Sequence, residues 1–146
     1  MTDDESLPDP APDCAAHFTD PLYDDPASDF APLGNDEGAD LLAEWAERRE
    51  ELGADSTVAD VLEEEGPDGT ADELDVPVPA SGVVPDGLVD AAMRMQGAGF
   101  TLLRLTGRID ERGRRDTLKA LDVLISLYGS EPALVRQRED LDSWRG

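Results

Sequence analysis

Apolar residues recur at three- and four-residue spacing over a long stretch of the chain between residues 86 and 109. The stripe consists of Leu88, Ala92, Met95, Gly99, Leu102, Leu105 and Ile109. This spacing predicts an amphipathic helix whose broad apolar face another part of the protein must cover. Asp86 is the expected N-cap. Gly97 and Gly99 each weaken a helix by about 1 kcal/mol relative to alanine, so they indicate either a close helix crossing or a local bend.

Two more helices are predicted after this one. A break is expected between Thr106 and Gly113, and Gly129 ends the helix that follows it. Ser130 and Pro132 then begin a last helix, as its cap and as a first-turn residue. The apolar positions of the two helices are Leu118, Leu121, Leu124, Ile125 and Tyr128, and then Leu134, Leu141 and Trp144.

The first half of the chain has a weaker pattern. Helical spacing of Leu41, Leu42, Trp45 and Leu52 predicts a short amphipathic helix that Gly53 ends. Thr57 and Asp60 form a capping-box pattern for a second short helix. Prolines interrupt the chain after it and favour an extended linker.

Before these helices, aspartate, proline and serine dominate, which is typical of disorder. Five apolar residues are nevertheless spaced among the carboxylates: Phe18, Leu22, Tyr23, Phe30 and Leu33. They either cover the folded part of the same chain or bind another protein.

The predicted fold class is therefore mainly α, a small C-terminal helical bundle with a long acidic, largely disordered N-terminal region carrying one or two short helices. The predicted parts are an acidic disordered tail (1–37), short amphipathic helices (38–66), a Pro-rich extended linker (67–85) and a three-helix domain (86–146). A domain of about 60 residues buries only about 60% of its unfolded surface, so association with a partner or a second copy is expected.

Charge divides the chain in the same way. Residues 1–85 hold 25 of the 35 acidic residues and two basic ones, while residues 86–146 hold ten of each sign. The formal net charge of -23 argues against direct binding to nucleic acid or to anionic lipid. No apolar run approaches the about 20 residues that span a bilayer, and a single cysteine excludes an intrachain disulfide. We expect a cytoplasmic protein with no membrane association.

Little in the sequence indicates catalysis. Cys14 and His17 have the spacing of a metal-ligand pair, but His17 is the only histidine and a structural zinc site needs four ligands. The serines and threonines lack a base in the helical part. We predict no metal, no cofactor and no enzymatic activity.

A basic row is the other notable feature. Its members, Arg104, Arg108, Arg112 and Arg115, share one exposed face if the helix persists. The row either is a solvated surface, or binds an acidic partner, or docks the protein's own acidic segment.

These features favour a non-catalytic adaptor protein that binds another protein. The expected partner-binding residues are Leu41, Leu42, Trp45 and Leu52, acting as helical anchors in a hydrophobic groove while carboxylates meet a basic rim. The same residues would alternatively close the core of their own domain. Two other functions stay open: an acidic decoy that imitates DNA and inhibits a nucleic-acid-binding protein, and a phage or multi-subunit scaffold component.

Overall fold

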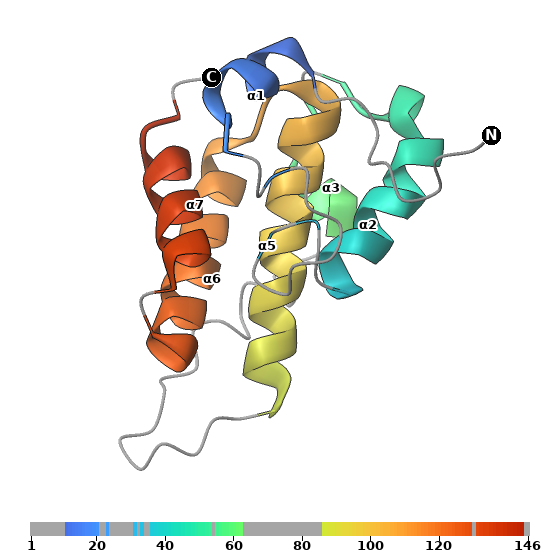
Figure 1. Cartoon of the computed structure of the whole chain (residues 1–146). Coiled ribbons are helices and arrows are strands. Elements are labelled where there is room, and N and C mark those ends of the chain that lie inside the picture. Colours follow the sequence, from blue (N-terminus) through green and yellow to red (C-terminus); the bar gives the residue numbers. More distant parts are fainter. Residues whose placement is uncertain are drawn as a thin grey trace, which may run out of the picture.

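The structure is a computed structural model that describes residues 11–20, 23, 31, 33, 36–53, 55–62, 86–129 and 131–144. Over these residues the chain is helical and contains no strand, which confirms the mainly α class (Figure 1). The elements are α1 (Pro12–His17), α2 (Asp36–Glu47), the 3-10 turn η2 (Arg49–Glu51), α3 (Val58–Leu62), α5 (Asp86–Thr106), α6 (Glu111–Tyr128) and α7 (Pro132–Asp142). No helix among the described residues is both long enough and apolar enough to cross a membrane.

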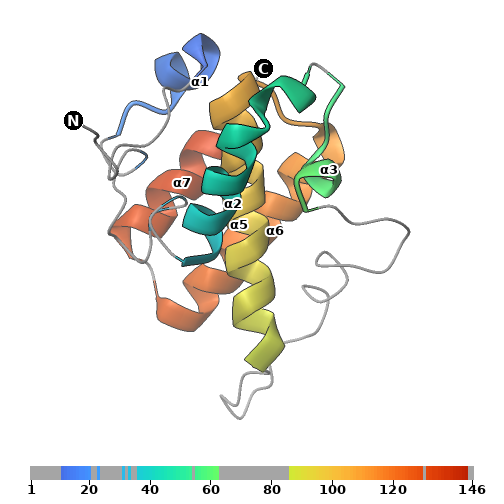
Figure 2. The same cartoon turned by 90° about the vertical axis from the view of Figure 1, so that its right-hand side faces the viewer.

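Helix α5 is the centre of the molecule. It packs against α2 and against α6, while α7 packs on α6 and α3 lies against both α5 and α6. Figure 2 shows α2 crossing in front of α5, with α7 on the far side of the bundle. Every residue from 95 to 105 is buried, so the C-terminal half of α5 is covered all around.

The predicted break between the first two C-terminal helices is confirmed. Helix α5 ends at Thr106, and Gly107 follows with a φ of 74°, a conformation that glycine adopts without strain. Helix α6 ends where predicted, before Gly129. Pro132 occupies the first turn of α7, whose N-cap is Glu131, and the predicted cap Ser130 lies outside the described residues.

The two glycines of α5 mark close helix crossings. A Cβ atom at Gly97 would lie 2.5 Å from the Cα of Gly38 in α2. At Gly99 it would collide with the side chain of Thr117 in α6. The absence of a side chain therefore brings α2 and α6 close to α5, as one of the two sequence interpretations expects.

The start of α3 is held by the predicted capping box. The backbone N–H of Asp60 donates to Thr57 Oγ1 at 3.1 Å, and the N–H of Thr57 donates to Asp60 Oδ2 at 2.9 Å. Asp110, the N-cap of α6, accepts from the N–H groups of Gly113 and of Val58, each at 2.9 Å. One carboxylate thus joins the beginnings of α3 and α6.

Part of the predicted acidic tail differs from the expectation of disorder. Residues 12–17 form α1, and the buried core includes Phe18, Tyr23 and Leu33 together with residues of α5, α6 and α7. The physical reason is the aromatic content, because the burial of a large aromatic side chain contributes about 1.5–3 kcal/mol. The predicted linker at 67–85 and most of the tail, Leu22 and Phe30 included, lie outside the described residues.

Candidate functional site

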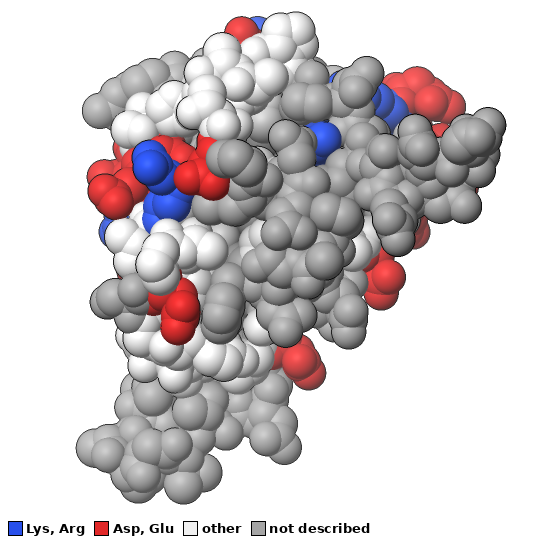
Figure 3. Space-filling view, viewed as in Figure 1, with Lys and Arg blue, Asp and Glu red and all other residues white. Residues whose placement is uncertain are grey.

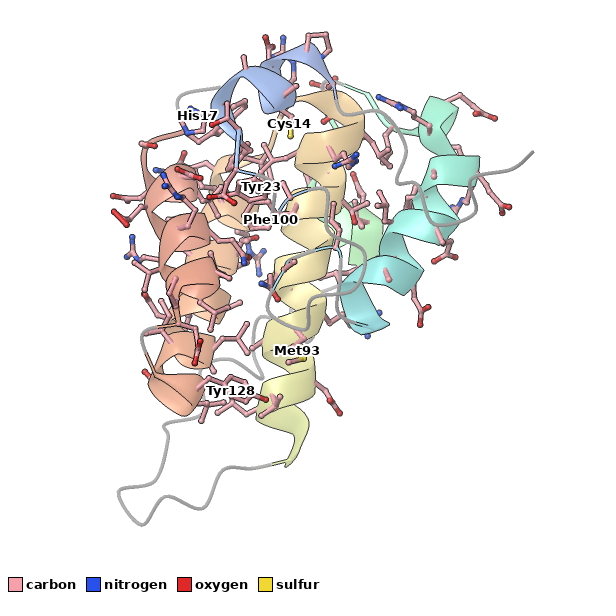
Figure 4. The ribbon with its side chains drawn as sticks, in the orientation of Figure 1. Cys14, His17, Tyr23, Met93, Phe100 and Tyr128 are labelled. Atoms are coloured by element: carbon pink, nitrogen blue, oxygen red, sulfur yellow. The ribbon has the colours of Figure 1, made fainter. Side chains whose placement is uncertain are left out.

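Distant parts of the chain meet where α1 and Tyr23 contact the C-terminal half of α5 and the end of α7. We call residues 11–20 and Tyr23 the N-terminal segment. Ala11, Cys14 and Phe18, at helical spacing, are its buried residues around α1, and Tyr23 is buried as well. Figure 4 shows Cys14, His17, Tyr23 and Phe100 gathered at this end of the bundle.

Aromatic rings form the apolar part of this contact. The Phe18 ring lies 5.5 Å from that of Phe100 in α5 and 5.4 Å from that of Trp144, which follows α7. Tyr23 stacks on Phe100 at 5.6 Å, and His17 meets Trp144 edge-on at 5.2 Å. Such pairs contribute about 0.5–1.5 kcal/mol each beyond the area they bury.

Hydrogen bonds fix the position of the segment along the bundle. The N–H of Ala11 donates to the Arg104 carbonyl at 2.7 Å, and Arg104 Nη1 donates to the Tyr23 carbonyl at 3.1 Å. The Tyr23 hydroxyl donates to Asp140 Oδ2 at 2.7 Å. An exposed ion pair, Arg136 with Asp20 at 3.5 Å, adds little.

The Tyr23 hydroxyl is held in its neutral form. Burial is the main cause that raises its pKa above the ordinary value of 10.0, and the hydrogen bond to Asp140 and the negative charges of Asp140 and Asp20 act in the same direction. Tyr23 is therefore a hydrogen-bond donor at neutral pH and has no capacity to act as a base there.

His17 and Ser143 lie close together but lack the arrangement of a nucleophile and its base. His17 Nε2 is 2.6 Å from the Asp140 carbonyl oxygen and 3.1 Å from Ser143 Oγ. Because a carbonyl oxygen carries no proton, Nε2 must be the donor in the shorter contact. A protonated Nε2 cannot accept the proton of Ser143, whose hydroxyl donates to the same carbonyl at 3.0 Å. These contacts hold the segment on α7.

Cys14 and His17, the pair with the spacing of metal ligands, lie in different surroundings. Cys14 is buried, and His17 contacts the end of α7. Within the described part of the chain, no group of three or more histidine, cysteine, aspartate or glutamate side chains could hold a metal ion.

A hollow of about 570 Å³ lies beside α7. It is lined by Asp20, Pro132, Ala133, Val135, Arg136 and Glu139. None of these six residues is buried, so the hollow is an open depression of the surface and lacks the enclosed, apolar character of a ligand pocket.

The predicted partner-binding residues face inward. Leu42 and Trp45 are 2% and 4% exposed, and the Trp45 indole N–H donates to the Val61 carbonyl at 2.8 Å. Leu41 and Leu52 are partly buried and pack against the same core. The alternative interpretation, in which these residues close the core of their own domain, is the one that the structure matches. They are not exposed to serve as anchors.

The opposite side of α2 is acidic. Exposed carboxylates of Asp40, Glu44 and Glu47 follow one another at helical spacing and continue into Glu50 and Glu51 of η2. We call these five residues the acidic face. Figure 3 shows acidic side chains along the edge where Figure 1 places α2.

The two arginines of this region contact their own chain. The Arg48 guanidinium lies 4.0 Å above the Trp45 ring and pairs with Glu44 at 3.5 Å and Glu51 at 3.0 Å. Its hydrogen bond lowers the pKa of Glu51 below the ordinary value. Arg49 donates to the Leu105 carbonyl near the end of α5 at 3.2 Å.

The predicted arginine row is divided by the end of α5. Arg104 lies within α5, is 5% exposed and binds the Tyr23 carbonyl. Arg108 is exposed in the connection to α6, and Arg112 and Arg115 are exposed on α6. The N-terminal segment thus docks on a single arginine of the row, and it also makes ring contacts with Phe100 and Trp144.

Asp140 is a residue of this site that the sequence did not indicate. Its partners, Tyr23 and His17, are more than a hundred positions away in the chain, and no local spacing indicates such a contact. The aromatic residues within the acidic tail were the available signal.

No family model matches the chain, and no curated protein and no solved structure matches it either.

Proposed function

We propose that this chain is a non-catalytic, cytoplasmic adaptor protein that binds a basic partner protein through the acidic face of α2 and η2. The observation that carries the proposal is the contrast between the two sides of α2. One side, with Leu42 and Trp45, is buried in the core, and the other presents a row of exposed carboxylates.

Burial of Trp45 gives the acidic face a fixed geometry. Because the indole ring is enclosed and hydrogen-bonded to Val61, the helix cannot rotate and its carboxylates keep their spacing. Charges that are already in position cost little ordering entropy when a partner binds. They also accelerate the encounter with a basic surface, an effect that salt weakens.

The nearby arginines do not cancel this surface. Arg49 is directed to the end of α5, and Arg48 lies over Trp45 with Glu44 and Glu51 on either side. Asp40 and Glu47 are exposed carboxylates of the same row. They are the best positions at which to test the face, because their replacement leaves the Arg48 ion pairs in place.

The same geometry supports a second function, that of an acidic decoy for a nucleic-acid-binding protein. A mimic of DNA needs carboxylates at fixed spacing on rigid elements, and the acidic face has that property. A basic partner that normally binds DNA would then be occupied by this chain.

The test is capture from a lysate of the native host by the immobilised full-length chain. Asp40→Asn/Glu47→Gln removes two charges from the acidic face, and we expect it to lose basic proteins that the natural chain retains at low salt. Asp90→Asn/Glu139→Gln is the matched control, since it removes two exposed carboxylates from α5 and α7. Equal loss with both variants would show a dependence on net charge alone and would refute a binding face.

Added duplex DNA distinguishes the adaptor function from the decoy function, because DNA displaces the partner of a decoy and leaves an adaptor complex intact.

A further inference from the structure

The N-terminal segment has the physical character of a bound peptide. Helix α1 has six residues, and no side chain caps its start at Ala11. An isolated helix of this length is unstable in water, so the contacts with the bundle must supply its order. Those contacts come from residues 82 to 126 positions away, on α5 and at the end of α7.

The surface beneath the segment has the features of a recognition site. Phe100 and Trp144 receive the Phe18 ring, and Phe100 also receives Tyr23. Buried aromatic anchors of this kind dominate the binding energy of peptide and protein interfaces.

Two polar residues of the bundle define the direction and register of the bound segment. Arg104 binds both ends of the segment. Its backbone carbonyl accepts from the N–H of Ala11, and its guanidinium donates to the Tyr23 carbonyl. Asp140 accepts from the Tyr23 hydroxyl with its carboxylate and from His17 with its carbonyl. A ligand for this surface must therefore present an aromatic pair, a hydroxyl and free backbone groups at these spacings.

We propose that Phe100, Arg104, Asp140 and Trp144 form a peptide-binding site, and that a second copy of this chain occupies it by exchange of the N-terminal segment. The segment of one copy then binds the bundle of the other with the same contacts that it makes within its own chain. Since these contacts are preserved, the exchanged and unexchanged forms differ mainly by the entropy of association.

The length of the connection permits this exchange. Residues 24–30 join Tyr23 to Ala31 and Leu33, which are 0% and 2% exposed, and a connection of this length spans at most about 25 Å when extended. That reach is shorter than the about 30 Å diameter of a small domain, so the segment can leave its own bundle and meet a neighbouring one when the two copies lie side by side. The intramolecular form competes at an effective concentration in the millimolar range, and exchange is therefore favoured at high protein concentration or during folding.

This site is a different surface from the acidic face, and the inference goes beyond the proposed adaptor function. Exchange would join two copies while the carboxylates of α2 remain exposed. The expected partner at this site is the same chain, whereas the expected partner at the acidic face is a basic protein.

Two complementary full-length variants test the exchange. Asp140→Ala/Trp144→Ala damages the site and keeps the segment, while Cys14→Ala/Phe18→Ala/Tyr23→Ala damages the segment and keeps the site. Each variant alone lacks one half of the contact and is expected to be monomeric. In the mixture, the intact segment of the first can bind only the intact site of the second, so that a mixed dimer is the largest assembly that this contact can form.

Sedimentation and thiol labelling report the result. Cys14 is the only cysteine, it is buried beside the segment contacts, and in the mixture only the first variant retains it. We expect a mixed dimer in which labelling of Cys14 is at least about tenfold slower than in the first variant alone, because the closed state protects the thiol. Persistence of two monomers overturns the proposal, and so does a dimer whose Cys14 is labelled as fast as in the isolated variant.

Refolding of the natural chain gives a second test that does not depend on the folding of the variants. Unfolded chain that is returned to native conditions at about millimolar concentration is expected to yield dimers with Cys14 as protected as in the monomer. Recovery of monomers alone under these conditions contradicts exchange. Circular dichroism of each variant verifies that α5, α6 and α7 are retained.

Discussion

Tyr23 shows how one buried hydroxyl makes the stability of this protein depend on pH. Its pKa is raised in the folded state, chiefly by burial, whereas the unfolded chain ionises near the ordinary value of 10.0. Below pH 10.0 the hydroxyl keeps its proton in both states, so its contribution to the free energy of unfolding is complete there. At higher pH the unfolded state loses a proton that the folded state keeps, and stability falls.

We therefore predict that the free energy of unfolding decreases between about pH 9 and about pH 11. Tyr23→Phe should make this decrease smaller, because phenylalanine has no proton to lose. Tyr128→Phe is the matched control, because Tyr128 is 43% exposed. This substitution should leave the dependence of the free energy of unfolding on pH unchanged. Denaturant unfolding at a series of pH values measures all three proteins. Equal slopes for the natural chain and for Tyr23→Phe would contradict this prediction.

Gly97 makes a second residue-scale prediction. Alanine is a better helix former by about 1 kcal/mol, but its Cβ would lie 2.5 Å from the Gly38 backbone. Because two helix backbones must separate to make room, we expect Gly97→Ala to lower the free energy of unfolding by about 1–3 kcal/mol. At Gly53 nothing lies within 4 Å of the added atom, so Gly53→Ala should be neutral or slightly stabilising. If the Gly97→Ala protein is as stable as the Gly53→Ala protein, α2 and α5 are not in close contact where they cross.

At the scale of elements, Asp110 joins two helices that are distant in sequence. Its Oδ2 accepts from the N–H of Gly113 in α6, and its Oδ1 accepts from the N–H of Val58 in α3. Both groups belong to helix beginnings, where backbone N–H groups lack partners within the helix and where a negative charge is favourable. The carboxylate therefore stabilises each helix and fixes their relative position.

We predict that Asp110→Ala lowers the free energy of unfolding by about 2 kcal/mol, which corresponds to the loss of two caps. Thr57→Ala removes one exposed cap and should cost about 1 kcal/mol. Asp110→Asn keeps a single acceptor oxygen and should fall between the natural chain and Asp110→Ala. Chemical unfolding of the three variants tests this order, and a cost for Asp110→Ala no greater than for Thr57→Ala would show that the link to α3 contributes nothing.

The helices themselves were largely predictable from the sequence, and their partners were not. Apolar spacing and the glycine and proline positions locate α5, α6 and α7 because these signals act within a few residues. The bond from Asp110 to Val58 joins positions 52 apart, and no local pattern encodes it. Trp45 illustrates the same limit, since an apolar stripe requires a cover but does not say whether the cover is the chain's own core or another protein.

For the molecule as a whole, composition and burial act against each other in the N-terminal segment. Net charge and proline content predict that the beginning of the chain stays unfolded. Phe18 and Tyr23 nevertheless lie in the core, because the aromatic contacts with Phe100 and Trp144 outweigh the repulsion. Average charge could not reveal this, since two aromatic residues change the composition little and the free energy of docking considerably.

The balance of these forces predicts an unusual response to salt. If the segment were held mainly by charge on the arginine row, salt would release it. The structure instead has aromatic contacts and a buried Arg104 bound to a carbonyl, and its ion pair between Arg136 and Asp20 is exposed and weak. Salt also screens the repulsion among the excess carboxylates of a chain whose formal charge is -23.

We therefore expect Cys14 labelling in the natural chain to become slower as sodium chloride is raised from about 0.05 to about 0.5 M, because screening favours the docked segment. Arg136→Gln should change the rate little at either concentration, since it removes only the exposed ion pair. Helicity measured in parallel separates release of the segment from unfolding of the bundle. Faster labelling at high salt would identify charge as the force that holds the segment, and would favour docking of the acidic segment on the arginine row.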